Sequence, residues 1–322
     1  MVLKKRILVI CSPVGNLGNR LFLFSNFIAF AEQNNCEVIN PTFSEYAGYF
    51  ETTSHDVFCR YPPRRSVFPK NNPVLQKLFS RSIWTAATMV KKMPKNRFFY
   101  TFDLEKIEER LSLDNDNFVR TIRRGKIIFF RGWLFVDQKN VIKHADKIRG
   151  YFSPLDKYKN LIDFPIKRLR SSCDVILGIV VRQGDYKQWR SGKYFFGIDT
   201  YVQWMAEAEN LFPKKKVGFF ICSDEELNTN KFAGFNFIFR AKHDLENRYT
   251  LARCDYILSV PSTYGGWAAF YGSVPIDILN SSEQVVSLAK FKIIENHMDL
   301  RDSTFPPAVD VTDVLTRNLP PT

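Results

Sequence analysis

The sequence lacks the long apolar run that a membrane-spanning helix requires, which is roughly eighteen or more residues. The run that follows Lys4, Lys5 and Arg6 extends only from residue 7 to residue 11, before Pro13 and Gly15. It is also too short for the apolar region of a signal peptide. We therefore expect residues 7–11 to form a buried first strand and the protein to be cytoplasmic.

Cysteine pairs and common cofactor motifs are missing as well. The six cysteines are scattered and none forms a C-x-x-C pair, which favours reduced thiols over disulfides or a metal site. The one close match to a D-x-D metal motif, Asp114-Asn115-Asp116, stands in a polar stretch that we interpret as a loop. Neither G-x-G-x-x-G nor a P-loop lysine follows the first strand. We expect no metal and no cofactor.

The formal net charge of +13 has several possible explanations. Basic proteins can bind nucleic acid, an anionic membrane or a phosphorylated substrate, and they can simply carry a solvated basic surface. Nucleic-acid-binding motifs are absent and the cations are spread along the chain, so we expect no specific nucleic acid partner. In Leu75–Lys92, apolar residues recur at helical spacing. This segment would either contact an anionic inner leaflet peripherally or pack on its own domain, and its basic residues are Lys77, Arg81, Lys91 and Lys92.

Short apolar runs alternate with helical patterns along the chain, which is typical of an α/β protein with parallel sheets. The predicted strands are Ile7–Cys11, Ile127–Phe130, Val175–Val181, Val217–Cys222 and Tyr256–Val260, and the predicted helices include Asn19–Asn34, Gln138–Tyr151, Thr200–Leu211 and Leu245–Cys254. The pattern restarts after the basic stretch Asp156–Ser172. We therefore predict two Rossmann-like domains, residues 1–165 and residues 166–322, that face each other across a cleft.

The first chemical motif, Gly15-Asn16-Leu17-Gly18-Asn19, lies between the first predicted strand and the first predicted helix. Glycines at such a turn let backbone N–H groups approach a ligand closely. Asn19 stands at the predicted start of the helix, so it could also be an ordinary N-cap. Gly15, Gly18 and Asn19 are candidate ligand-binding residues.

Three further motifs each follow a predicted strand of the second domain, where open α/β sheets bind ligands. Arg182 can grip phosphate oxygens with two N–H groups, and Asp185 is close enough to orient it; the alternative is a structural pair. Ser223-Asp224 could contact a base or ribose, or cap a helix. Ser262-Thr263 precede a small-residue helix start, where hydroxyl and N–H groups suit a diphosphate. Together they predict an anion site for a nucleotide diphosphate at one sheet edge.

These segments resemble the alpha-1,2-fucosyltransferase family and related GDP-fucose-dependent enzymes. That family shows G-G-L-G-N-Q-x-F, H-x-R-R-G-D-Y, F-x-S-D-D and C-x-x-x-I-x-x-x-S-T-F-S-W-W-G-A. Here the corresponding segments begin at Gly15, Val180, Phe220 and Cys254, in the same order. The family histidine is Val180, its second arginine is Gln183, and its Ser-Trp pair is Gly265-Gly266.

The resemblance implies a GT-B fold and an inverting transfer of a sugar, fucose in the family, from a GDP-sugar to a hydroxyl without a metal. Arg182 would bind the β-phosphate, Asp224 would lie near the guanosine, and Ser262 and Thr263 would bind phosphate. Gly18 and Asn19 would face the donor from the other domain. The partners implied are a GDP-sugar, as co-substrate, and a glycan or lipid-linked glycan acceptor in bacterial polysaccharide biosynthesis.

Other functions stay open at this point. The departures from the family motifs allow another nucleotide sugar as donor, or an acceptor that is not a glycan. A nucleotide-binding epimerase or dehydrogenase would need the glycine fingerprint and an acidic ribose contact after the first strand, and both are missing. The catalytic base is not identifiable, since Asp185 is better placed in sequence to orient Arg182.

Overall fold

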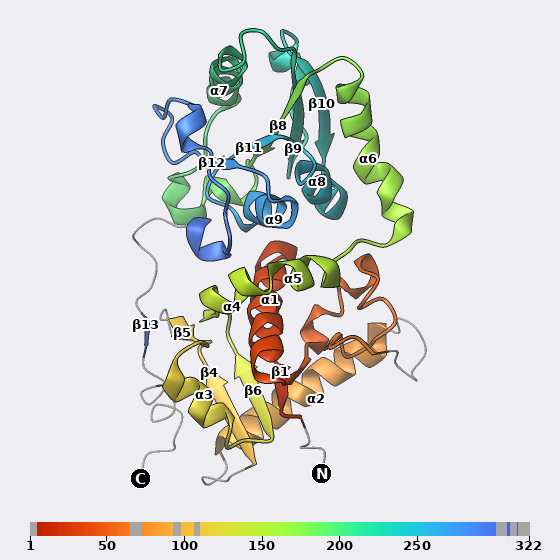
Figure 1. The fold of residues 1–322 in the computed structure, drawn as a ribbon, viewed down its shortest axis with the longest axis vertical. Helices are drawn as coiled ribbons and strands as arrows, with labels where there is room; N and C mark the ends of the chain where they lie inside the picture. Colours follow the sequence, from red (N-terminus) through yellow and green to blue (C-terminus); the bar gives the residue numbers. More distant parts are fainter. Residues whose placement is uncertain are drawn as a thin grey trace. The chain divides into compact units, whose positions relative to one another are not determined.

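The computed structural model describes residues 5–64, 73–92, 98–105, 110–300, 308–309 and 314 (Figure 1). The chain divides into two compact units, Met1–Leu155 with Asp302–Thr322, and Asp156–Arg301. Each unit has a five-stranded sheet that is largely or wholly parallel, with helices on both faces. The α/β fold expected from the alternating pattern is confirmed.

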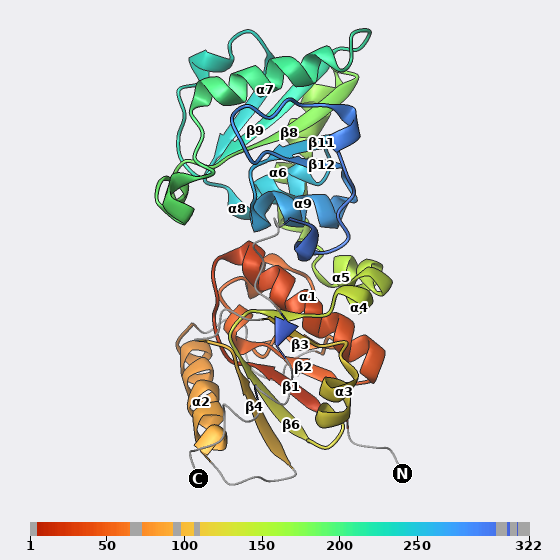
Figure 2. The same cartoon turned by 90° about the vertical axis from the view of Figure 1, so that its left-hand side faces the viewer.

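The sheet of the first unit has the strand order β3-β2-β1-β6-β4, and only β3 is antiparallel to its neighbour. Helix α1 covers one face and helix α2 covers the other (Figure 2). The bounds are β1 Ile7–Ile10, α1 Leu17–Asn34, β2 Glu37–Ile39, β3 Arg60–Tyr61, α2 Pro73–Lys92, β4 Phe99–Asp103, β5 Arg110–Ser112, α3 Asp116–Ile122, β6 Ile127–Arg131, β7 Phe135–Val136, α4 Gln138–Lys143 and α5 Ala145–Tyr151.

Helix α2 packs on the sheet through its apolar face. Ile83, Ala87 and Val90 join a core cluster with Val9 and Phe129. The opposite face exposes 54% of Leu78 and 62% of Met89. One face of α2 therefore packs on its own unit, which was one of the two alternatives for this segment. The side chains of Lys77 and Lys92 lie outside the described residues. No helix in the described part of the chain is long and apolar enough to cross a membrane.

The second unit contains a fully parallel sheet in the order β10-β9-β8-β11-β12. Alternate residues of β8 and β9 pack with α7 on one face, and α6, α8 and α9 lie on the other (Figure 2). All seven residues of β8 are buried, as expected for a continuous apolar run. The bounds are α6 Asp156–Arg170, β8 Val175–Val181, α7 Ile198–Asn210, β9 Val217–Ser223, β10 Asn236–Ala241, α8 Asp244–Leu251, β11 Tyr256–Ser259, α9 Thr263–Gly272 and β12 Ile276–Ile278.

The observed division differs from the predicted domains 1–165 and 166–322 in two places. The boundary falls before Asp156, because the basic stretch forms α6, whose Ile162 and Leu169 are buried within the second unit. The chain then returns to the first unit, where β13 (Ala308–Val309) pairs with β5 in a small three-stranded sheet.

Three local predictions need correction. Helix α1 begins at Leu17 with Asn16 as its N-cap residue, so Asn19 lies within the first turn. The predicted helix Gln138–Tyr151 is two helices that meet at the non-helical His144. The Asp114-Asn115-Asp116 stretch starts α3, because the Asn115 side chain accepts hydrogen bonds from two backbone N–H groups of the first turn.

The buried carboxyl group of Asp277 in β12 predicts a pH effect on stability. Asp277 is only 3% exposed; its Oδ1 accepts a hydrogen bond from Gln284 at 2.9 Å, while Oδ2 has no partner among the described residues. Burial raises the pKa of Asp277 to about 6, against about 3.9 in an unfolded chain. Above pH 6 the folded protein therefore carries a buried charge that destabilises it.

We expect Asp277→Asn to raise the melting temperature relative to the parent by an amount that grows from about pH 4 to pH 7. The control is Asp199→Asn, since the side chain of Asp199 is 81% exposed. A melting-temperature difference that stays constant over this range would contradict the assignment.

Candidate functional site

The strand order of the second unit creates a switch point between β8 and β11. The chain continues from β8 to β9 on one side and places β11 on the other. Ligands of open α/β sheets bind beyond the carboxyl ends of the strands at such a point. Arg182 follows β8 directly, and Ser262 at the start of α9 follows β11. The Tyr186 hydroxyl donates a 2.6 Å hydrogen bond to the carbonyl of Pro261 and so joins the two strand ends.

The guanidinium of Arg182 lies among two carboxylates and an aromatic ring. Its Nη2 donates to Asp185 Oδ1 at 2.7 Å, and its Nε lies 3.5 Å from Asp224 Oδ2 without an aligned hydrogen bond. The guanidinium carbon lies 4.8 Å from the centre of the Tyr186 ring. Burial acts to lower the pKa of Arg182, but the charge of Asp224, followed by Tyr186 and Asp185, outweighs it and raises the pKa. Arg182 is therefore a permanent cation.

Asp224 holds the turn that carries this arginine. Its carboxylate accepts hydrogen bonds from the backbone N–H groups of Gln183 at 2.9 Å and Gly184 at 3.3 Å. A Cβ atom at Gly184 would lie 3.2 Å from Asp224 Oδ2, so a side chain there would press on this carboxylate. No helix begins at Asp224, and Ser223 is 6% exposed, with its hydroxyl accepting from the Glu225 N–H at 3.1 Å. The helix-cap alternative for this pair is therefore wrong.

The start of α9 forms the other side of the switch point. Ser262 is the N-cap residue, and its hydroxyl accepts from the Tyr264 N–H at 2.9 Å. Arg248, only 2% exposed, donates to the carbonyls of Thr263 and Tyr264 at 3.2 Å each and stacks on the Tyr264 ring at 4.1 Å. Its charge lies beside the first turn of α9, and Asp244 pairs with it at 2.6 Å.

Arg248 is a residue of this site that was not predicted from the sequence. The sequence does place a cation in the middle of the predicted helix 245–254, among residues that turn out to be buried. That position could have indicated a buried, functional cation. A buried cation at a helix start adds to the positive potential of that end.

The departures from the fucosyltransferase motifs have structural explanations. Val180 is buried within β8, and the side-chain nitrogen of Gln183 donates to the Phe196 carbonyl at 2.9 Å, which closes the following loop. At Gly265 and Gly266, a Cβ atom would lie 2.4 Å from Ser259 Oγ and 2.0 Å from Leu300 Cδ1. These residues serve close packing at the switch point.

In the first unit, Gly15 lies in the turn between β1 and α1, and Asn19 lies in the first turn of α1, with its side chain against Gly15. Gly15 has a φ of +62°, and a Cβ atom there would lie 2.1 Å from the Asn19 side-chain nitrogen. Gly18 is buried in the first turn of α1. Arg20 ties the turn down, because its guanidinium donates to the carbonyls of Gly15 at 3.0 Å and Thr42 at 2.8 Å.

The candidate residues thus form two groups. Those of the second unit gather at the switch point, namely Arg182, Asp185, Ser223, Asp224, Ser262 and Thr263. Those of the first unit lie just before α1 and in its first turn, namely Gly15, Gly18 and Asn19. Among the described residues, no three His, Cys, Asp or Glu side chains are grouped so that they could hold a metal ion.

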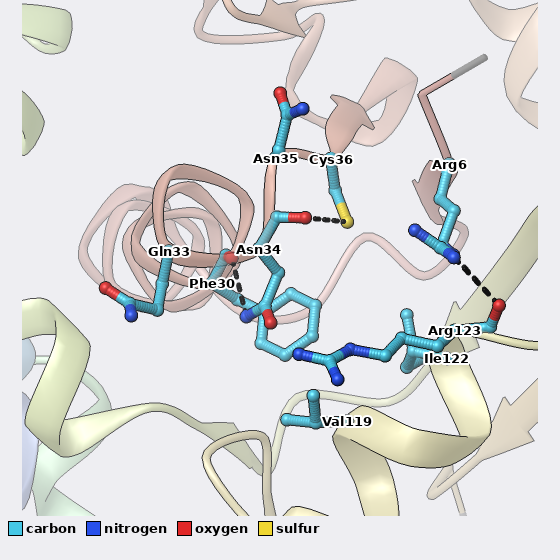
Figure 3. A pocket seen from close by; sticks show the side chains of 9 residues that line it. All are labelled: Arg6, Phe30, Gln33, Asn34, Asn35, Cys36, Val119, Ile122 and Arg123. Carbon is cyan, nitrogen blue, oxygen red and sulfur yellow. Dashed lines mark hydrogen bonds between the residues drawn. The ribbon is translucent and has the colours of Figure 1, made fainter. Parts of the chain in front are cut away.

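A pocket of about 230 Å³ in the first unit is lined by none of these residues (Figure 3). Arg6, Cys36 and Arg123 line it, just before β1, β2 and β6 begin, so it is at the amino ends of the strands. Burial raises the pKa of Cys36 to about 11, so its thiol is not a nucleophile at neutral pH. The pocket offers no catalytic group.

Solved structures with a similar fold include two fucosyltransferases. A variant of Arabidopsis thaliana FUT1 in complex with GDP superposes with a TM-score of 0.56 at 13% identity, covering 96% of this chain and 77% of that chain. Fucosyltransferase NodZ from Bradyrhizobium gives 0.50 at 15% identity, covering 91% and 100%. The chain has a fucosyltransferase-like fold. No protein-family model and no curated protein sequence matches it.

The tight packing at the start of α9 leads to a stability prediction. Gly265→Ala should lower the free energy of unfolding by about 1–3 kcal/mol, because the methyl group overlaps Ser259 Oγ and forces the helix start to shift. Gly234→Ala is the matched control, since a Cβ atom there meets nothing within 4 Å. Urea unfolding of both variants tests this, and equal midpoints would refute it.

Proposed function

We propose that this protein is an inverting, metal-independent glycosyltransferase that moves a sugar, fucose, from a GDP-sugar to a hydroxyl of a glycan. The observation that carries the proposal is the convergence of Arg182 and the start of α9 at the switch point of a parallel sheet. A nucleotide diphosphate has the charge and the size that such an edge accommodates. The likeness in fold to FUT1, which was solved with GDP, supports the choice of nucleotide.

The chemistry assigned to the chain is stabilisation of the leaving diphosphate. Negative charge grows on the phosphate as the bond to the sugar C1 breaks and the acceptor hydroxyl attacks from the opposite face. A preorganised guanidinium and a helix start lower the energy of that state without a metal. Arg182 has this role in our proposal, and Ser262 and Thr263 bind phosphate at the start of α9.

The two carboxylates beside Arg182 have different roles in this proposal. Asp224 is committed to the backbone of the turn, so we assign it to positioning Arg182 rather than to contacting the guanosine. The side chain of Asp185 is 62% exposed and can move aside. In the absence of a donor, the Asp185 carboxylate accepts the Arg182 N–H that a phosphate oxygen would accept in our proposal. The guanidinium is therefore already held in place for an anion.

The acceptor in this proposal is a glycan or lipid-linked glycan, reached in the cytoplasm at the inner leaflet during polysaccharide synthesis. The exposed face of α2, with Leu78, Arg81 and Met89, is assigned to peripheral contact with an anionic membrane. A different nucleotide sugar is the main alternative for the donor, since Val180 and Gln183 stand where the family has a histidine and an arginine.

GDP should stabilise the protein against heat, and UDP should do so less. A ligand present at 100 times its Kd adds about 2.7 kcal/mol to the stability of the folded state. A thermal-shift comparison of GDP, UDP, ADP and CMP at equal concentrations measures the preference. Equal or larger shifts with UDP or CMP would reject a GDP-sugar as donor.

Arg182→Ala should lower the rate at which GDP-fucose releases GDP, as water or an acceptor hydroxyl takes the fucosyl group, by about 10²–10³-fold while the protein stays folded. Arg182→Lys should recover little, because an ammonium group lacks the two-pronged contact. Release is measured chromatographically in EDTA, since the proposed reaction needs no metal.

Lys231→Ala is the control for that experiment, as Lys231 is an exposed cation of the same unit. If Arg182 served structure alone, its removal would lower the melting temperature and leave the turnover of the folded fraction intact. That result would overturn its assignment.

A further inference from the structure

The sheet of the first unit has a switch point of its own, between β1 and β6. The chain continues from β1 to β2 on one side, and β6 lies on the other. Ser12 comes shortly after β1, and Arg131 is the last residue of β6. Both side chains are buried, with Ser12 4% and Arg131 7% exposed. Open α/β sheets bind ligands beyond such a pair of strand ends.

The Glu105 carboxylate bridges these two strand ends. Its Oε1 accepts a 2.5 Å hydrogen bond from the Ser12 hydroxyl, and its Oε2 accepts from Nη2 of Arg131 in an ion pair. The backbone is held as well, because the Leu104 N–H donates to the Arg131 carbonyl at 2.8 Å and the Glu105 N–H donates to Asp103 Oδ1 at 3.1 Å. The carboxylate is therefore fixed across the switch point.

The neighbouring carboxylate, Asp103, is fully engaged within the cluster. It is 9% exposed, and its Oδ2 accepts from Lys91 at 2.9 Å and from Nη1 of Arg131 at 3.0 Å. The side chain of Glu105 differs, since 31% of it is exposed. A carboxylate offers about four lone-pair positions, of which two accept from Ser12 and Arg131 here. Glu105 can therefore accept a further hydrogen bond from a bound molecule.

An exposed tryptophan lies beside the arginine that holds this carboxylate. The Trp84 side chain of α2 is 44% exposed, and the guanidinium carbon of Arg131 lies 4.8 Å from its ring centre. Lys91 of the same helix pairs with Asp103, so this side of α2 follows the carboxyl ends of β6 and β4. An apolar ring beside a carboxylate matches a sugar, whose C–H groups contact the ring face and whose hydroxyls donate hydrogen bonds.

We propose that this edge of the first unit binds the acceptor sugar and that Glu105 is the catalytic base. The transfer needs a group that takes the proton of the acceptor hydroxyl. The two carboxylates beside Arg182 are engaged otherwise, because Asp224 accepts from the backbone of its turn and Asp185 pairs with the guanidinium. This inference rests on the proposed function, since it supplies the base for that reaction.

The proposed step balances as follows. The acceptor oxygen forms a bond to C1 of the donor sugar, and the bond from C1 to the diphosphate oxygen breaks, with its electron pair leaving on the phosphate. The hydroxyl proton passes to an oxygen of Glu105 and from there to water. Ser12 and Arg131 orient the carboxylate for this transfer, and the Trp84 ring supports one face of the acceptor sugar.

Glu105→Gln tests the base in the full-length protein, with water as the acceptor. It should lower the kcat for GDP release from GDP-fucose by about 10²-fold and leave the KM for GDP-fucose unchanged. Glu105→Asp should recover part of the rate, because it keeps a carboxylate. Glu209→Gln is the matched control, since Glu209 is an exposed carboxylate on α7 and its loss should change nothing.

Chemical rescue separates a base from a structural ion pair. Formate should restore part of the rate of Glu105→Ala, because a small carboxylate can enter the space of the missing side chain and accept the proton. A folded Glu105→Ala variant whose rate formate leaves unchanged would overturn the assignment. So would a Glu105→Gln variant that melts at a lower temperature but keeps the turnover of its folded fraction.

Trp84→Ala tests the sugar surface. GDP release is measured with added cello-oligosaccharides, galacto-oligosaccharides or N-acetyllactosamine, and at least one of them should accelerate it in the parent. Trp84→Ala should raise the KM for that sugar about tenfold and leave the rate in water unchanged, whereas Trp84→Phe should recover part of the affinity. The control is Phe164→Ala on α6, whose side chain is 61% exposed. Acceleration by no sugar, or equal KM values in the parent and Trp84→Ala, would overturn the sugar surface.

A thermal shift with GDP on every variant distinguishes failure of this inference from failure of the proposed function. Variants of Glu105 and Trp84 that lose turnover or sugar affinity but keep the GDP response support the inference. Loss of the GDP response in Glu105→Gln would mean that this edge binds the nucleotide, which overturns it. A parent that does not respond to GDP refutes the proposed function itself, whatever the rates are.

Discussion

The candidate site depends on one carboxylate that joins two adjacent strands. β8 and β9 are paired so that Val181 lies opposite Ser223, and the residue that follows β9 is Asp224. Its carboxylate accepts hydrogen bonds from the backbone N–H groups of Gln183 and Gly184, in the turn that follows β8. These hydrogen bonds fix the direction in which the chain leaves the sheet after β8, and so they fix Arg182 at the start of the turn. They also bring Tyr186 within hydrogen-bond distance of the Pro261 carbonyl. A buried N–H group without an acceptor is costly, so this carboxylate is difficult to replace.

Much of the fold could be predicted because its central strands are continuous apolar runs. Val175–Val181 is buried at every position, and in an α/β chain a short continuous apolar run of this kind is typical of a strand covered on both faces. Short or half-buried elements could not be found this way. β12 has three residues, β10 is buried only in part, and β13 has two residues whose partner is almost two hundred positions away. The basic stretch in which the domain boundary was predicted forms α6, because a few apolar residues suffice to dock a helix.

The residue types at the strand ends were accessible from the sequence, but their partners were not. The position of Asp224 after a buried strand indicated the site edge, whereas its two backbone donors come from another strand. Gln183 looked like the loss of a charged group, yet it closes the loop through the Phe196 carbonyl. Glu105 was not predicted as a site residue, since only the fold brings it to Ser12 and Arg131. Pairing across sequence distance is a tertiary property, and a single sequence does not contain it.

The return of the chain to the first unit has a consequence for synthesis. Residues 156–301 are continuous, but the first unit needs β13, which is translated after the whole second unit. During synthesis from the amino terminus, the second unit can therefore complete its sheet before the first has all its strands. Until then β5 has an open edge on the side that β13 will occupy. Exposed strand edges invite pairing with other chains, so the order of translation leaves the first unit as the part most in need of protection.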